Sequence, residues 1–171
     1  GALTALMGSG LLPEQGVARR CRAMKGTLPL ANLSQLLQCQ LPRVTGDGTA
    51  RDPLSAPDPL SNPILAPIPL LGVVAFNGFG SLLWPAGGLA DLDVPVLLVG
   101  GSVDLVTPPV QEQLNLFVHV SHPRSRLVVV DGGSHFSLVR LDNQGQALFR
   151  LGQELVGRDP RKVQNLILSL T

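Results

Sequence analysis

Three runs of apolar and β-branched residues stand out in the second half of the chain. They cover Leu71 to Phe76, Val94 to Gly100 and Arg126 to Asp131, and turn-forming residues bound each run. Uninterrupted apolar runs of this length are typical of strands that are buried on both faces, as in a parallel sheet. The pattern therefore predicts a parallel sheet that contains these three strands.

Helical patterns alternate with the strands. Pro108 and Pro109 suit the first turn of a helix between the second and third strands, since a proline there loses no hydrogen bond. One face of that helix is expected to be apolar: Val110, Leu114, Phe117 and Val118. One or two closing helices are expected from a further apolar set: Leu148, Leu151, Leu155, Val163, Leu166, Ile167 and Leu170. Strands that alternate with helices predict an α/β fold with right-handed crossovers.

The first half of the chain predicts two helices and a long loop. Residues 1–10 are small and apolar with helical spacing, and they end at glycines, which predicts a short buried helix. A second helix is expected over residues 30–40 from a leucine pattern: Leu30, Leu33, Leu36 and Leu37. Residues 42–70 are too rich in proline for a helix or a central strand, so they are expected to form a covering loop.

Charge and hydropathy exclude two classes of partner. The 13 Lys and Arg residues nearly balance the 12 Asp and Glu residues, so the formal charge of +1 gives no basic field for a nucleic acid. The apolar runs fall far short of the roughly 20 residues that cross a bilayer.

Charged residues make up only 15% of the chain and hydrophobic residues 44%. Together with a first residue that is not Met, this balance indicates a piece of a longer protein whose other parts cover some of this surface.

An acidic and a basic side chain follow two of the predicted strands. In an open parallel sheet, ligands bind beyond the carboxyl ends of the strands. Asp104 lies just after the second strand, and His135 lies just after the third. A histidine that takes a proton from a nucleophile needs a carboxylate on its other ring nitrogen. Each residue alone also has a structural explanation, a turn contact for Asp104 and a loop position for His135, but the two together favour catalysis.

These two loops resemble the C-terminal half of α/β-hydrolases. In GLADLDVPVLLVGGSVDLVTPP and RLVVVDGGSHFSLV, Asp104 and His135 match the positions of the catalytic acid and histidine of that superfamily. The segments NLSQLLQCQ, VVAFN and GGSHFS give a finer resemblance to bacterial predicted dienelactone hydrolases, which lie near platelet-activating-factor acetylhydrolases. The resemblance implies a cofactor-free hydrolase of carboxylic esters or lactones that uses a Ser-Asp-His triad.

The chain departs from the superfamily pattern at the nucleophile. No G-x-S-x-G elbow occurs in the sequence, but its opening residues, GALTAL, resemble the helix that follows such an elbow. We therefore expect the nucleophile just upstream of residue 1, and we expect the chain alone to be inactive. Ser9 and Ser134 are expected to be structural, while Ser81 and Ser102 are expected in turns, where lining a pocket is the less favoured alternative.

The resemblance implies that residues 1–171 form one partial domain. Residues 1–41 would hold the helix after the elbow and a cap-like helix, and residues 42–70 the proline-rich loop. Residues 71–171 would hold the last strands and helices, which carry the acid and the base. Phe79 and Trp84 follow the first predicted strand and are candidates for contact with an apolar ester, although packing in the core is an equal alternative.

Cysteines and the remaining histidines add little chemistry. Cys21 and Cys39 fit a disulfide in an exported enzyme, and they also fit two reduced thiols in a cytosolic one. The resemblance to exported bacterial hydrolases tilts this choice slightly towards a bridge and an exported or periplasmic location. His119 and His122 have helix-like spacing without a nearby Cys or carboxylate cluster, which favours a helix C-terminus over a metal site.

Two other classes of function compete with the esterase hypothesis. The first is a non-catalytic binding or interaction module that keeps the α/β-hydrolase scaffold, since a fold alone does not decide function. The second is a nucleotide-binding fold, which is disfavoured because no G-x-G-x-x-G follows a strand. The sequence leaves open which ester is cleaved, its leaving group and the oligomeric state.

Overall fold

The structure is a computed structural model of the chain. It describes the following residues: 2–9, 11, 13–24, 33–40, 70–85, 87–136 and 159–170. Nearly all of the predicted proline-rich loop lies outside the described residues, as do Leu30, Leu148, Leu151 and Leu155.

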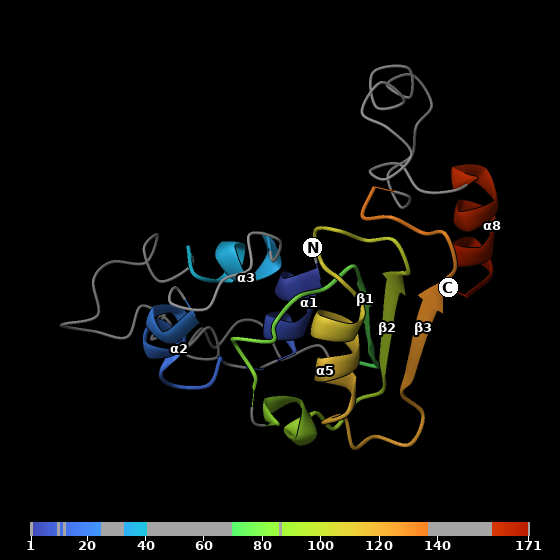
Figure 1. The fold of residues 1–171 in the computed structure, drawn as a ribbon. Helices are drawn as coiled ribbons and strands as arrows, with labels where there is room; N and C mark the ends of the chain where they lie inside the picture. Colours follow the sequence, from blue (N-terminus) through green and yellow to red (C-terminus); the bar gives the residue numbers. More distant parts are fainter. Residues whose placement is uncertain are drawn as a thin grey trace, which may run out of the picture.

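A parallel three-stranded sheet organises the described part of the chain (Figure 1). Its strands are β1 (Val73–Phe76), β2 (Val96–Gly101) and β3 (Arg126–Val130). They are hydrogen-bonded in the order β1-β2-β3, and both pairs are parallel. The predicted α/β fold with a parallel sheet is confirmed.

Burial on both faces, predicted for all three strands, holds only for the central one. Most residues of β2 are buried. Val74 in β1 and Val129 in β3 are exposed, because these strands form the two edges of the described sheet and are covered only in part. The prediction is therefore wrong for the outer strands in the part of the chain that the structure describes.

Helices surround the sheet on both sides. They are α1 (Ala2–Gly8), α2 (Val17–Met24), α3 (Leu33–Gln38), η2 (Gly88–Asp91), η3 (Val110–Leu114), α5 (Asn115–Phe117) and α8 (Pro160–Leu170). The predicted first, second and last helices correspond to α1, α3 and α8, whereas the sequence pattern does not predict α2. Among the described residues, no helix has the length and apolar character needed to span a bilayer.

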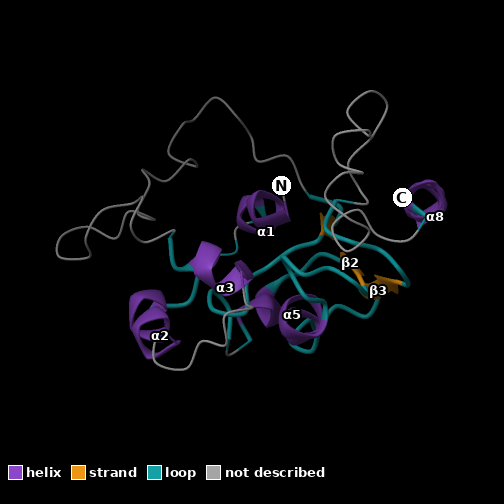
Figure 2. Cartoon of the chain, turned by 45° about the horizontal axis from the view of Figure 1, so that its top comes forward, coloured by secondary structure: helices purple, strands orange, loops and turns teal. Residues whose placement is uncertain are grey.

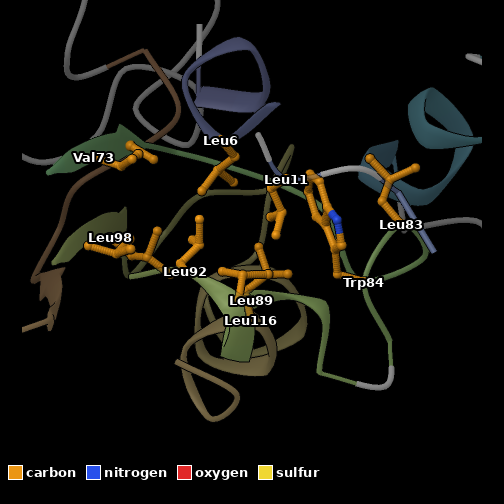
Figure 3. Close-up of a cluster of buried hydrophobic side chains, with 11 residues drawn as sticks. Leu6, Leu11, Val73, Leu83, Trp84, Leu89, Leu92, Leu98 and Leu116 are labelled. Carbon is orange, nitrogen blue, oxygen red and sulfur yellow. The ribbon is translucent and has the colours of Figure 1, made fainter. Parts of the chain in front are cut away.

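Two clusters of buried apolar side chains hold the helices against the two faces of the sheet. On one face of the sheet, Leu6 of α1 and Leu116 of α5 pack with Leu98 of β2 and with Trp84 (Figure 3). On the other face, Val163 and Ile167 of α8 pack with core residues from the two neighbouring strands: Val99 and Val130. Figure 2 shows α8 on the far side of β2 and β3 from α5. The sheet is therefore the middle layer of three.

The helix after β2 turns a different face to the core than the sequence predicts. Val110 is 65% exposed, and Leu114 and Val118 are also exposed. Glu112 and Gln113 are buried instead. Of the predicted apolar face only Phe117 packs against the main core cluster, next to the fully buried Leu116. The first part of this helix is a π-helical turn, in which the backbone N–H of Leu114 donates to the carbonyl of Pro109.

Helix α3 is inverted relative to its apolar pattern. Leu33 and Leu36 are exposed, while Ser34 and Gln38 are fully buried. Ser34 Oγ and Gln38 Nε2 donate to the carboxylate of Glu112. The polar side of α3 therefore faces the buried carboxylate. Burying a carboxylate without hydrogen-bond donors would cost more free energy than leaving two leucine side chains exposed to water.

The Glu112 carboxylate also orders the segment after β1. Its Oε2 atom accepts from the backbone N–H groups of Gly80 and Ser81 at 2.9 and 3.0 Å. Its Oε1 atom accepts from Ser81 Oγ at 3.0 Å and from Gln38 Nε2 at 3.2 Å. Uncharged donors from two distant segments thus converge on one buried carboxylate, which compensates its loss of water.

A disulfide joins α2 to the end of α3. Cys21 of α2 is bonded to Cys39, which directly follows α3, and their Cα atoms are 5.6 Å apart. Of the two alternatives that the sequence leaves open, the structure contains the bridge. Arg20 of α2 donates from Nε to the carbonyl of Leu82 at 2.7 Å, so α2 and α3 are both attached to the segment that follows β1.

We expect Glu112→Gln to destabilise the fold strongly. The amide keeps the shape of the carboxylate but turns one acceptor into a donor that faces other donors. The free energy of unfolding, measured by urea denaturation, should fall by about 2 to 4 kcal/mol. Gln111→Ala, on the exposed side of the same helix, is the control and should change it by less than about 0.5 kcal/mol. An unchanged midpoint for Glu112→Gln would show that the carboxylate is not needed.

Candidate functional site

The carboxyl ends of the three strands meet at one edge of the sheet. Asn77 follows β1, Asp104 follows β2 at the end of a short turn, and His135 follows β3. Because the strands are parallel and adjacent, the segments that leave them are neighbours. The two residues that the sequence singles out as acid and base are therefore brought to the same place.

Two glycines allow the acid and base segments to approach closely. A Cβ atom added to Gly101 would overlap the carbonyl group of Gly133, so these backbones pack directly against each other. The backbone N–H of Val103 also donates to the carbonyl of Gly133 at 2.9 Å. Gly132 adopts a left-handed backbone with φ of 71°, which turns the chain from β3 back towards β2.

Asp104 and His135 are hydrogen-bonded to each other. The distance from His135 Nδ1 to Asp104 Oδ2 is 3.0 Å. The Asp104 side chain is fully buried, whereas 29% of the His135 side chain is exposed. Since an ionised carboxylate only accepts hydrogen bonds, Nδ1 carries the proton, and Nε2 is left as the acceptor. This is the arrangement a general base requires.

The second oxygen of Asp104 has a separate structural task. Oδ1 accepts from the backbone N–H groups of Val106 and Thr107, both at 2.8 Å. This is the turn contact that the sequence offers as the alternative explanation for Asp104. The structure contains both arrangements at once, because one carboxylate oxygen stabilises the turn and the other binds the imidazole.

Asn77 holds the backbone of His135. Its Nδ2 atom donates to the carbonyl oxygen of His135 at 2.8 Å. Asn77 has a φ of 46°, a left-handed conformation that asparagine tolerates better than most residues. The sequence patterns do not identify this role, and the only signal for it is an asparagine directly after a buried strand. The ring of Phe136 adds an edge-on contact to the imidazole, with centroids 5.5 Å apart.

Thr107 is the other residue at the site that sequence reasoning misses. Its side chain is buried, and Oγ1 lies 2.8 Å from Asp104 Oδ2 and 3.2 Å from His135 Nδ1. A threonine three residues after an aspartate is a common turn pattern, so the sequence alone gives no reason to separate it from its neighbours.

The serines weighed as structural or turn residues have identifiable places. Ser9 Oγ donates to the carbonyl of Leu6, and Ser81 Oγ donates to Glu112. Ser102 Oγ accepts from the backbone N–H of Gly132 and donates to Asp131, so it joins the turns after β2 and β3. Ser134 is buried next to His135 in the chain.

The two aromatic candidates differ in their surroundings. Trp84 is fully buried in the main core cluster, and a Cβ atom at Gly80 would lie 2.6 Å from its ring. The alternative of core packing accounts for Trp84. Phe79 is only partly buried, so its side chain remains accessible.

The described residues offer no evident metal site. No group of three or more His, Cys, Asp or Glu side chains among them is placed to hold an ion. His119 and His122 lie beyond the end of α5, and His122 Nδ1 accepts from the backbone N–H of Arg124 at 3.2 Å. The candidate site in the described residues is the pair Asp104 and His135, with Asn77 and Thr107 beside it.

Similarity to known proteins is confined to solved structures. No protein-family model matches the chain, and no curated protein sequence matches it significantly. A meta-cleavage product hydrolase (CumD) from Pseudomonas fluorescens IP01, solved as a serine-to-alanine variant with acetates, is similar over 90% of this chain at 20% identity and a TM-score of 0.30. Another meta-cleavage product hydrolase (CumD) structure, an alanine-to-valine variant, gives 88% coverage, 19% identity and the same TM-score. The chain spans about half the length of these solved structures, 48% of each.

We expect Gly101→Ala to disturb the edge of the sheet where the site lies. Its Cβ atom has no room beside Gly133, so the His135 segment must move away from Asp104. The free energy of unfolding should fall by about 1 to 3 kcal/mol in urea denaturation. Gly8→Ala is the matched control, because nothing lies within 4 Å of its new methyl group. Equal midpoints for the two variants would contradict the close packing.

Proposed function

We propose that this chain supplies the acid and the base of a serine-type hydrolase that cleaves carboxylic esters or lactones. The observation that carries the proposal is the hydrogen bond of 3.0 Å between buried Asp104 and partly exposed His135 at the carboxyl edge of a parallel sheet. The resemblance of both segments to α/β-hydrolases supports the same assignment. The nucleophilic serine is proposed to lie just upstream of residue 1, in the elbow motif that the sequence lacks.

The proposed reaction begins with His135 as general base. Nε2 removes the proton from the serine hydroxyl as the serine oxygen attacks the ester carbonyl carbon. The resulting imidazolium then donates the same proton to the leaving alkoxide, which departs as an alcohol and leaves an acyl-enzyme. In the second half of the reaction, water gives a proton to Nε2 as its oxygen attacks the acyl carbon. The imidazolium then returns this proton to the serine oxygen as its bond to the acyl carbon breaks, which releases the carboxylic acid and restores the serine.

Asp104 acts through His135 in this mechanism. Its carboxylate keeps the proton on Nδ1 and stabilises the positive charge that forms on the ring. Burial strengthens this contribution, because water does not screen a fully buried carboxylate. The two backbone N–H groups on Oδ1 fix the carboxylate, so it does not have to reorganise during the reaction.

An apolar ester is the substrate class that we propose. Phe79 is partly accessible in the segment after β1, close in sequence to Asn77, which contacts the site.

The Cys21–Cys39 disulfide supports an exported or periplasmic enzyme, since such bonds persist in oxidising compartments.

We expect His135→Ala in the complete protein to lower kcat for a p-nitrophenyl ester by about four to six powers of ten. Asp104→Asn should lower kcat by about two to four powers of ten, because the amide favours the wrong tautomer. His122→Ala, which removes a histidine outside the pair, is the control and should retain activity. Near-full activity in both site variants would refute the assignment.

The upstream sequence separates the enzyme from a non-catalytic module. A G-x-S-x-G motif that ends at or near Gly1 supports the esterase, and residues 1–171 alone should be inactive without it. An alanine or glycine in place of that serine would instead support a binding module that retains the scaffold.

A further inference from the structure

Thr107 connects the segments that leave all three strands. Its buried Oγ1 atom lies 2.8 Å from Asp104 Oδ2, 3.2 Å from His135 Nδ1 and 3.2 Å from the carbonyl oxygen of Asn77. Asn77 belongs to the segment after β1 and His135 to the segment after β3. One hydroxyl oxygen therefore lies within hydrogen-bonding distance of three parts of the chain that are distant in sequence, and its single proton serves one acceptor at a time.

We propose that Thr107 is a positioning residue that fixes the ring orientation and the tautomer of His135. This inference rests on the proposed function, because it assigns the way in which the acid-base pair is kept ready. Thr107 touches neither a substrate nor the reacting Nε2 atom, and it acts through His135 and Asp104.

The number of protons at the site determines how the hydroxyl is used. A threonine hydroxyl has one proton to donate, and Asp104 Oδ2 is both its nearest acceptor and its only charged one. With that proton directed at Oδ2, the lone pairs of Oγ1 are free for the Nδ1–H group of His135. The Nδ1 proton is then shared between Oδ2 at 3.0 Å and Oγ1 at 3.2 Å.

A shared proton restricts the ring more than a single hydrogen bond does. With one acceptor, the imidazole can tilt about its bond to Cβ and keep the contact. Two acceptors on the same side define both the tilt of the ring and the nitrogen that carries the proton. The hydroxyl oxygen also places a second partial negative charge beside the imidazolium that forms in the proposed reaction.

Asn77 completes the arrangement. Its Nδ2 atom donates to the carbonyl of His135, and its own carbonyl oxygen, 3.2 Å from Thr107 Oγ1, is the alternative acceptor that the hydroxyl proton gives up when it is directed at Asp104. The backbone N–H of Asn77 donates to the carbonyl of Val99 in β2 at 2.8 Å. The support for the imidazole is thus attached to the backbone of the central strand, which is the most buried strand of the described sheet.

Two pairs of variants isolate the hydroxyl group. The first pair is the wild type and Thr107→Val, which differ by a hydroxyl in place of a methyl group of similar size. The second pair is Thr107→Ser and Thr107→Ala, which both lack the methyl group and differ only in the hydroxyl. Measured in the complete enzyme, kcat should fall about 10- to 100-fold in the valine and alanine variants, the effect of one hydrogen bond to a charged group. It should stay within about threefold of wild type in the serine variant, and KM should change little in all of them.

Proton NMR supplies a readout that a merely structural role would not change. The Nδ1–H resonance of His135, assigned by its loss in His135→Ala, should shift and exchange faster with water in the valine and alanine variants. The serine variant should keep the wild-type resonance. Because this signal needs no turnover, it tests Thr107 even if the complete protein proves to hydrolyse no ester.

The outcomes are distinct. Wild-type kcat and an unchanged Nδ1–H resonance in Thr107→Val would overturn the proposal, as would equal losses in Thr107→Ser and Thr107→Ala. If Thr107→Val fails to fold in urea denaturation, the serine and alanine pair decides, because both lack the methyl group and differ only in the hydroxyl. Full activity in His135→Ala would refute the proposed function, and the resonance would still report whether Thr107 holds the ring.

Discussion

The buried carboxylate of Asp104 is the interaction on which the site depends. It accepts two backbone N–H groups on one oxygen, and Thr107 Oγ1 and His135 Nδ1 on the other. A buried charge is tolerated only when its hydrogen-bonding capacity is met. The turn after β2 and the segment after β3 are therefore fixed by the same requirement, and the orientation of the imidazole follows from it.

A second buried carboxylate, Glu112, performs a comparable task for the helices. It gathers donors from α3 and from Gly80 and Ser81, while its neighbour Gln113 donates from Nε2 to the carbonyl of Gly78. The segment after β1 thus lies between two groups: the Asp104–His135 pair, whose histidine carbonyl accepts from Asn77, and Glu112, which accepts from Ser81. The helices stabilised by the disulfide and the proposed catalytic pair are linked through this short segment.

The sequence was informative where burial is simple and misleading where polar groups are buried. Continuous apolar runs identified the strands, and Leu6 in the first helix is buried as its pattern implies. Leu33, Leu36 and Val110 are exposed against their patterns, because the buried Glu112 holds the polar side of α3 and of its own helix towards the interior. Hydrophobic periodicity contains no information about which carboxylate will be buried or which donors will reach it.

The sequence by itself determined the parallel strands, the placing of one acid and one histidine directly after two of them, and the absence of an elbow motif. These follow from residue type and order, which local patterns record. Only the tertiary structure decided that Asp104 and His135 are hydrogen-bonded, that Cys21 and Cys39 are bridged, and that Asn77 and Thr107 support the imidazole. These contacts join residues that are far apart in sequence or that lie in ordinary turns, so only the packing of the whole sheet brings their atoms within hydrogen-bonding distance.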